Sequence, residues 1–251
     1  MNSKNVIKSN KIGLKIIIGI LIVIAGLGLG FAGYVGNYYH ASDSVEAISD
    51  TENVQVIQTD TGYLYDGPGE DDALIFYPGA KVEAIAYGPL MKKLAAEGID
   101  CFLVDMPFNL AVFGINKADT ILEEYSADYS HWYMAGQSLG GAMAANYISK
   151  HEDDFEGLVL LAAYTATDLS GLDIKTVNIY GTRDGVLNMD KLSDSYDMMP
   201  EDSRAVQIAG GNHAQFGDYG EQKGDGIPEI SAREQQCQAA EAIAEFVAAG
   251  K

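Results

Sequence analysis

The stretch WYMAGQSLGG, residues 132–141, decides which fold the rest of the chain must build. Its first four residues are apolar and typical of a buried strand, and from Leu139 onward apolar residues recur at every fourth position, as in a helix. Between the two lies Gly136-Gln137-Ser138-Leu139-Gly140, which matches G-x-S-x-G. In a strand-turn-helix context this motif holds a serine on a strained turn that only glycine neighbours permit. The stretch therefore predicts Ser138 as a nucleophile.

Runs similar to the one before Ser138 recur along the chain. They are short, apolar on both faces and rich in β-forming residues, and they cover 73–77, 101–104, 132–135, 158–163, 177–180 and 205–208. Such runs suit the buried strands of a parallel sheet. Helical patterns lie between them, including 89–97 and an Ala-rich stretch at 232–248, and a hairpin pattern at 54–65 precedes them. We expect one α/β domain with helices on both faces of a mostly parallel sheet.

A serine hydroxyl needs an adjacent base, usually a histidine that a carboxylate holds in place. The chain contains four histidines, and in this architecture the base follows the nucleophile. His40 and His131 precede Ser138, and His151 lies at the far end of the helix that Ser138 begins. His213 stands in a loop directly after the last strand-like run. We therefore expect His213 to be the catalytic base.

The acid that orients the histidine should lie in an earlier loop at the same edge of the sheet. Asp184, in the loop Gly181-Thr182-Arg183-Asp184-Gly185 after the run 177–180, is the first candidate. Asp168, after the preceding run, is the alternative, because some members of this architecture take their acid from there.

An oxyanion needs two aimed donors, typically the amide after the nucleophile and one from a loop after an early strand. Leu139 supplies the first of these amides. Residues 78–81 follow the run 73–77, and Gly79 allows close backbone approach, so we expect Ala80 to supply the second, with Lys81 as its neighbour.

The amino-terminal part of the chain predicts a membrane anchor. Residues 1–15 hold four lysines and no acid, and an almost uninterrupted apolar stretch follows. Twenty helical residues rise about 30 Å, the thickness of a bilayer core. We expect a basic cytoplasmic segment at 1–15, a transmembrane signal anchor at 16–37, a linker at 38–53 and an extracellular domain at 54–251. Cleavage as a signal peptide, which would release a secreted protein, is the alternative.

The net charge of the chain limits the kinds of partner that it is expected to bind. The formal net charge is −20, and an acidic surface repels phosphate backbones and anionic headgroups, which argues against nucleic acid as a partner. Two cysteines make no disulfide framework. Carboxylates at Asp218, Glu221 and Asp225 suggest calcium as an alternative to a hydrated loop, although their spacing matches no EF-hand.

Four segments together resemble a known family: FYPGAKVEAIAYGPL at 76–90, GQSLGG at 136–141, YGTRDG at 180–185 and GGNHAQFGDYG at 210–220. Over residues 53–250 the chain is similar to compact bacterial α/β-hydrolases related to dienelactone hydrolases and small carboxylesterases. The resemblance implies the fold and serine-dependent acyl transfer. The short connection between the runs 158–163 and 177–180 separately predicts that no cap domain is inserted there. One departure matters, because dienelactone hydrolases use a cysteine where this chain has Ser138.

The sequence predicts hydrolysis of a small or surface-exposed ester through an acyl-enzyme, with no metal and no organic cofactor required. The short connection before the run 177–180 predicts an open cleft, which favours short-chain or neutral esters over long-chain lipids. Two alternatives stay open: an acyltransferase or peptidase that uses the same three residues, and a non-catalytic surface module on a hydrolase scaffold. Protein partners are not predicted.

Overall fold

The computed structural model describes residues 3–249, which divide into two compact units between Tyr38 and Tyr39. The first unit is built on one helix, α1 (Ser3–Val35). Its window Ile18–Val35 has a mean hydropathy of 2.3, and none of that window is buried. By length and composition this helix is able to cross a membrane, which fits the segment predicted at 16–37.

The second unit contains one eight-stranded sheet in the order β1-β2-β4-β3-β5-β6-β7-β8. The strands are β1 (Gln55–Thr59), β2 (Gly62–Asp66), β3 (Asp72–Tyr77), β4 (Ile99–Val104), β5 (His131–Gln137), β6 (Gly157–Leu161), β7 (Lys175–Gly181) and β8 (Ser203–Ile208). Strands β1 and β2 form an antiparallel hairpin, and β2 also pairs with β4 in the antiparallel sense. All pairs among β3 to β8 are parallel. The predicted fold class is confirmed, and each of the six predicted runs overlaps one of the strands β3 to β8.

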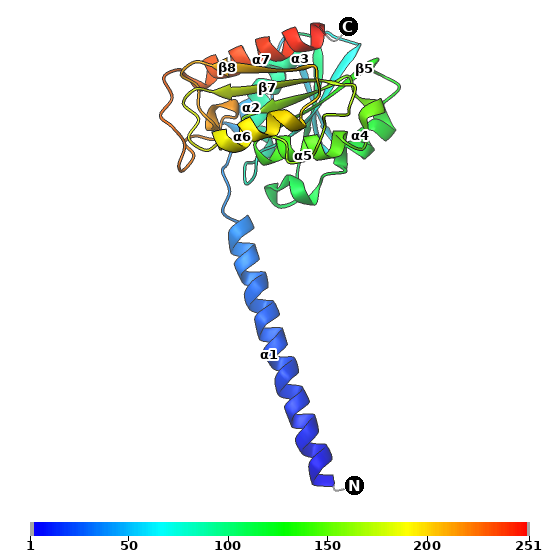
Figure 1. Ribbon diagram of the computed structural model, residues 1–251, viewed down its shortest axis with the longest axis vertical. Helices are drawn as coiled ribbons and strands as arrows, with labels where there is room; N and C mark the ends of the chain where they lie inside the picture. The colour runs from blue at the N-terminus through cyan, green and yellow to red at the C-terminus, as the bar shows by residue number, and fades with distance from the viewer. Residues whose placement is uncertain (1–2, 250–251) are drawn as a thin grey trace. The chain divides into compact units, whose positions relative to one another are not determined.

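Helices cover both faces of the sheet (Figure 1). One face carries α3 (Gly88–Ala96) and α7 (Ala232–Ala248), and the other carries α4 (Lys117–Tyr125) and α5 (Leu139–Ile148). Shorter helices are α2 (Ser44–Ala47), α6 (Met189–Ser195) and the 3-10 turns η1 (Ala84–Tyr87), η2 (Pro107–Asn109), η3 (Ala111–Phe113), η4 (Glu152–Asp154), η5 (Tyr196–Met198) and η6 (Ala214–Phe216).

Strand β3 shows why the sequence gives this layering. Leu74 and Phe76 belong to the core that α3 and α7 cover, and Ile75 and Tyr77 belong to the core on the opposite face. Because successive side chains of a strand point to opposite faces, a strand between two helical layers must be apolar at every position.

The connection between β6 and β7, residues 162–174, contains no helix or strand. No cap domain is therefore inserted there, as the sequence predicted, and the carboxyl edge of the sheet is left uncovered by an insertion at this point.

The segment predicted as a linker at 38–53 is in large part packed onto the domain. Tyr39 forms a parallel bridge with Val82, and Ala47 in α2 is 1% exposed. The phenol of Tyr65 donates a hydrogen bond to the carbonyl oxygen of Ala47 over 3.1 Å. The polar composition of 40–53 concealed the few apolar side chains that hold this segment in place.

Candidate active site

Ser138 lies on a strained turn between β5 and α5. Its backbone has φ 53° and ψ −121°, a conformation that residues other than glycine rarely adopt. The turn also requires close backbone contact, because a Cβ at Gly140 would lie 2.1 Å from the carbonyl oxygen of Tyr77. The amide of Ser138 donates to the carbonyl oxygen of Leu161 over 2.9 Å, which fixes the turn to the end of β6. The G-x-S-x-G motif thus forms the strained turn that the sequence predicts.

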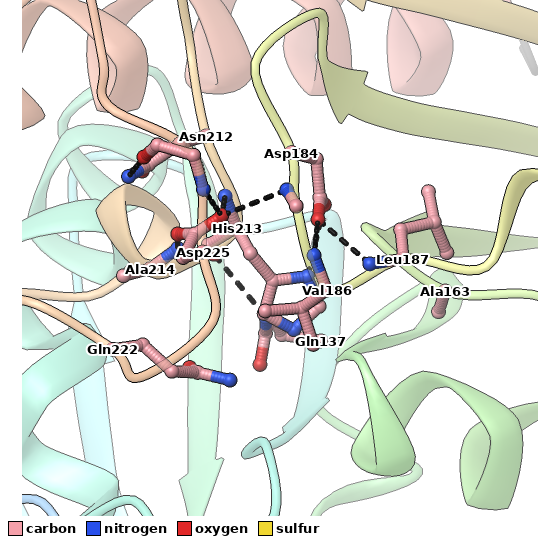
Figure 2. A network of polar contacts seen from close by, with 12 residues as sticks. Gln137, Ala163, Asp184, Val186, Leu187, Asn212, His213, Ala214, Gln222 and Asp225 are labelled. Atoms are coloured by element: carbon pink, nitrogen blue, oxygen red, sulfur yellow. Dashed lines mark hydrogen bonds and ion pairs between the residues drawn. The ribbon is translucent and has the colours of Figure 1, made fainter.

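Asp184 and His213 meet at the same edge of the sheet (Figure 2). Asp184 follows β7 and His213 follows β8, and Nδ1 of the histidine is 2.9 Å from Oδ2 of the aspartate. Their side chains are 2% and 1% exposed for His213 and Asp184. A carboxylate only accepts hydrogen bonds, so this contact places the imidazole proton on Nδ1 and leaves Nε2 able to accept one.

The carboxylate of Asp184 is held from two sides. Its Oδ1 accepts hydrogen bonds from the amides of Val186 and Leu187 at 2.8 and 2.7 Å, while Oδ2 accepts from His213. The orientation of the imidazole is therefore set by a carboxylate that cannot rotate without breaking backbone contacts.

Asp168, the alternative acid, points into a local turn instead. Its Oδ1 accepts from the hydroxyl and the amide of Ser170 at 2.7 and 3.0 Å. These two hydrogen bonds lower the pKa of the exposed Asp168 carboxyl. The geometry thus favours Asp184 over Asp168 as the partner of the histidine.

A buried chain of hydrogen bonds joins the loops of this edge, and the sequence reasoning missed it. The amide of Gly79 donates to the phenol oxygen of Tyr87, and Tyr87 donates to Oε1 of Gln137, at 3.2 and 2.9 Å. Nε2 of Gln137 then donates to the carbonyl oxygen of His213 over 3.4 Å. Burial raises the pKa of Tyr87, so the phenol stays a donor. The residue next to Ser138 thereby contacts the residue expected to be its base.

The two amides expected to bind an oxyanion belong to Leu139, the first residue of α5, and Ala80, in the loop after β3. Within the part of the chain that the structure describes, neither amide has a hydrogen-bond acceptor. By contrast, the amide of the neighbouring Lys81 donates to the carbonyl oxygen of Asn109 over 2.7 Å. Of the two residues at this position, Ala80 rather than Lys81 keeps an available donor.

Comparison with known families now places the chain. A family model described as alpha/beta hydrolase family matches residues 73–237. The chain belongs to the alpha/beta hydrolase family. Among curated proteins, none matches the chain by sequence.

Solved structures of two esterases and a dienelactone hydrolase share the fold at low sequence identity. An esterase from Pyrobaculum calidifontis is 17% identical with a TM-score of 0.59, over 81% of this chain and 89% of that one. A dienelactone hydrolase from Anabaena variabilis is 13% identical with a TM-score of 0.59, over 78% and 97%. Naproxen esterase from Bacillus subtilis is 14% identical with a TM-score of 0.57, over 81% and 94%.

In this alpha/beta hydrolase a second carboxylate, Asp225, braces the two loops that carry Asp184 and His213 (Figure 2). Its Oδ1 accepts from the amides of Gly185 and His213 at 3.0 and 3.2 Å, and its Oδ2 accepts from Ala214 at 2.9 Å. Backbone amides therefore bind both oxygens of Asp225, one of the three carboxylates that suggested calcium. No group of three or more His, Cys, Asp or Glu side chains suited to a metal ion is found within residues 3–249.

Proposed function

We propose that this alpha/beta hydrolase is a serine esterase whose catalytic residues are Ser138, His213 and Asp184. One observation carries the proposal: a serine on a strained strand-to-helix turn lies at the same sheet edge as a buried Asp-His pair. Structural strain and a buried ionisable pair are features that concentrate at functional sites.

The geometry supports an acyl-enzyme mechanism. Nε2 of His213 takes the hydroxyl proton as Oγ of Ser138 attacks the acyl carbon, and Asp184 stabilises the imidazolium. The carbonyl oxygen gains the negative charge and is bound by the amides of Ala80 and Leu139. Collapse of this intermediate expels the alcohol, which receives the proton from His213. Water, deprotonated by the same imidazole, then releases the acid and restores the serine.

We further infer that α1 anchors this enzyme in a membrane. The lysines in 1–15 favour a cytoplasmic amino terminus, so the domain would lie on the outer side. Cell fractionation tests this inference: activity in the membrane pellet supports it, and activity only in cleared culture medium contradicts it in favour of cleavage.

The function is tested on the full chain in detergent micelles with a fluorophosphonate probe and p-nitrophenyl esters of increasing chain length. Labelling at Ser138 together with ester hydrolysis, both lost in Ser138→Ala, supports the proposal. A folded protein that neither labels nor hydrolyses any ester would overturn it and favour a binding module. Comparing hydrolysis with transfer to added alcohols or amines separates an esterase from an acyltransferase.

A further inference from the structure

The proposed oxyanion donor Ala80 lies in a tight turn whose other amides are bound. The amide of Val82 donates to the carbonyl oxygen of Gly79 over 3.4 Å, which closes a four-residue turn. Lys81, its third residue, has φ 61°, the positive value that a type II turn requires at that position. The amide of Gly79 donates to the phenol oxygen of Tyr87, and the amide of Lys81 donates to a backbone carbonyl oxygen. In this turn, only the Ala80 amide has no acceptor within the described part of the chain.

The first position of this turn requires glycine because two side chains fill the space beside it. A Cβ at Gly79 would lie 2.0 Å from Oε1 of Gln137 and 2.8 Å from the phenol oxygen of Tyr87. Both side chains are buried, with Gln137 1% and Tyr87 0% exposed. Burial of an amide and a phenol is unfavourable unless they form hydrogen bonds. The turn, the phenol and the side-chain amide are therefore packed as one unit.

The hydrogen bonds through these two side chains have a fixed direction. A backbone amide can only donate and a backbone carbonyl can only accept, and this series runs from the amide of Gly79 to the carbonyl of His213. Tyr87 therefore accepts from Gly79 and donates to Oε1 of Gln137. Nε2 of Gln137 donates to His213 (Figure 2). Loss of the Tyr87 hydroxyl would leave the Gly79 amide and Oε1 of Gln137 buried without these partners.

The far end of the series holds the backbone of the proposed base. The amide of His213 donates to Oδ1 of Asp225 over 3.2 Å, and its carbonyl oxygen accepts from Gln137 over 3.4 Å. Its imidazole is paired with Asp184. Residue 213 is thus held through its amide, its carbonyl and its side chain. Of these three contacts, the one from Gln137, the last residue of β5, connects the base to the strand that carries Ser138.

We propose that Tyr87 and Gln137 are positioning residues that hold the Ala80 amide and the backbone of His213 in place relative to Ser138. Both side chains are buried, so they act through the backbone groups that they bind rather than by contact with a substrate. The proposal rests on ester hydrolysis by Ser138. Because the oxyanion forms only in the transition state, displacement of the Ala80 amide lowers kcat more than it raises KM.

The role of the phenol is tested with Tyr87→Phe, which removes the hydroxyl and keeps the ring. In the full chain in detergent micelles, kcat for p-nitrophenyl acetate should fall by about 10- to 100-fold, with KM within about twofold. Tyr133→Phe is the matched control, because this phenol is also buried in the same core and donates to the carbonyl of Val247 over 3.3 Å. The control should lose thermal stability and keep kcat within about twofold. Equal losses of kcat in both variants, or none in Tyr87→Phe, would refute the positioning role.

A double-mutant cycle connects this loss to the oxyanion donor. Ala80→Pro deletes the amide hydrogen, and proline is favoured at the second position of a type II turn. This variant should lower kcat by about 100-fold or more. Tyr87→Phe combined with Ala80→Pro should lose at least about fivefold less than the product of the two single losses, since the donor to be positioned is already gone. Losses that multiply would refute the action of the hydroxyl on the Ala80 amide.

Hydrogen exchange measures the positioning without relying on activity. In Tyr87→Phe and in Gln137→Met, the loops 78–83 and 209–217 should exchange their amide hydrogens faster than in the wild type, whereas Tyr133→Phe should leave both loops unchanged. If the wild type hydrolyses no ester but both loops respond, the esterase function fails and the link between the loops stands. If the wild type is an esterase and neither loop responds, the positioning role is refuted and the function stands.

Discussion

Two aspartate-histidine pairs with similar geometry lie at the two opposite edges of the sheet, where its parallel strands end and where they begin. At the carboxyl edge Asp184 and His213 are 2.9 Å apart, and at the amino edge Asp72 and His131 are 3.1 Å apart. Side-chain exposure separates them, since His213 is 2% exposed and His131 is 31% exposed. The distance between a carboxylate and an imidazole therefore does not by itself indicate a catalytic site.

The surroundings of the pairs make the difference. Asp184 and His213 stand in loops after β7 and β8, beside the strained turn of Ser138, whereas Asp72 and His131 are the first residues of β3 and β5. Loops at the carboxyl ends of parallel strands can converge on a ligand, while residues within a strand are committed to the sheet. The strained turn of Ser138 and its amides, rather than the aspartate-histidine pair, therefore define the proposed site.

The largest expected effect is at the turn itself. Ser138→Ala should reduce kcat for p-nitrophenyl acetate by about 10³- to 10⁶-fold while leaving the melting temperature close to that of the wild type. If Ser138→Ala turned over the ester as fast as the wild type, the serine mechanism would be wrong. The carboxyl edge of the sheet would then no longer be distinguished from the amino edge as the reaction site.

Substitutions of His213 and His131 should have very different effects on kcat. His213→Ala should cost about 10³-fold or more in kcat because it removes the base of the proposed mechanism. His131→Gln, made in parallel, should leave kcat within about twofold and change only thermal stability. Comparable losses from both substitutions, measured by the same ester assay, would show that the distinction between the pairs is wrong.

The aspartates refine the comparison further. Asp184→Asn should lower kcat by about 10²- to 10⁴-fold, since the amide favours the wrong imidazole tautomer. Asp72→Asn and Asp168→Asn should each stay within about twofold. A large loss in Asp168→Asn with a normal Asp184→Asn enzyme would transfer the role of the acid to Asp168.

Asp225 should act through position rather than chemistry. Asp225→Asn retains the size of the side chain but loses charge-assisted acceptance from Gly185 and Ala214, so we expect about a tenfold fall in kcat with little change in KM. Asp225→Ala should lose more than Asp225→Asn. Bound calcium that rescued either variant would contradict the bracing role.

The smallest effect concerns stability at the amino edge. Burial raises the pKa of the Asp100 carboxyl to about 6, although it accepts hydrogen bonds from Gly67 and Tyr129. A raised pKa means that the folded state binds the proton more tightly than the unfolded state, so stability falls as pH rises from about 4 to 6.

Asp100→Asn removes this penalty and retains an acceptor for the Gly67 amide. Relative to the wild type, the variant should be more stable at pH 8 than at pH 4.5, by a difference on the order of 1 kcal/mol. Thermal unfolding at both pH values measures it, with the exposed Glu70→Gln as a control that should show no such difference. A pH-independent offset would mean that Asp100 titrates normally.

Sequence patterns predicted the fold because its signals are local. Each of the strands β3 to β8 was visible as an apolar run, β1 and β2 were visible as a hairpin pattern, and the turn at Ser138 was visible as five consecutive residues. The catalytic role of Asp184 and His213 remains a prediction, but chain order and their positions in loops after strand-like runs were enough to predict their contact, with Asp168 as the alternative. Tyr87 gave no signal, because its role depends on Gln137, 50 positions away.

Asp225 and the segment at 39–42 show a second reason for failure. Three acidic residues in a glycine-rich loop suggested a cation, yet the Asp225 carboxylate bonds to amides, including that of Gly185, 40 positions earlier. The polar stretch after the predicted anchor suggested a linker, yet besides its few apolar side chains it binds the domain through the backbone amides of Tyr39 and Ser42, and every residue type shares such groups. Composition does not record where a backbone amide finds its acceptor.

The segment 39–42, in which Tyr39 pairs with Val82, also distinguishes two ways in which proteolysis could release the domain from its proposed anchor. A protease that cuts within 36–38 would free a domain that keeps the Tyr39 bridge to Val82 and the Ser42 contact to Asp218. A cut beyond Ser42 would remove both and leave the Lys81 carbonyl and the Asp218 carbonyl to water. The position of a single cleavage would thus decide whether the released domain keeps these contacts at the edge of its proposed active site.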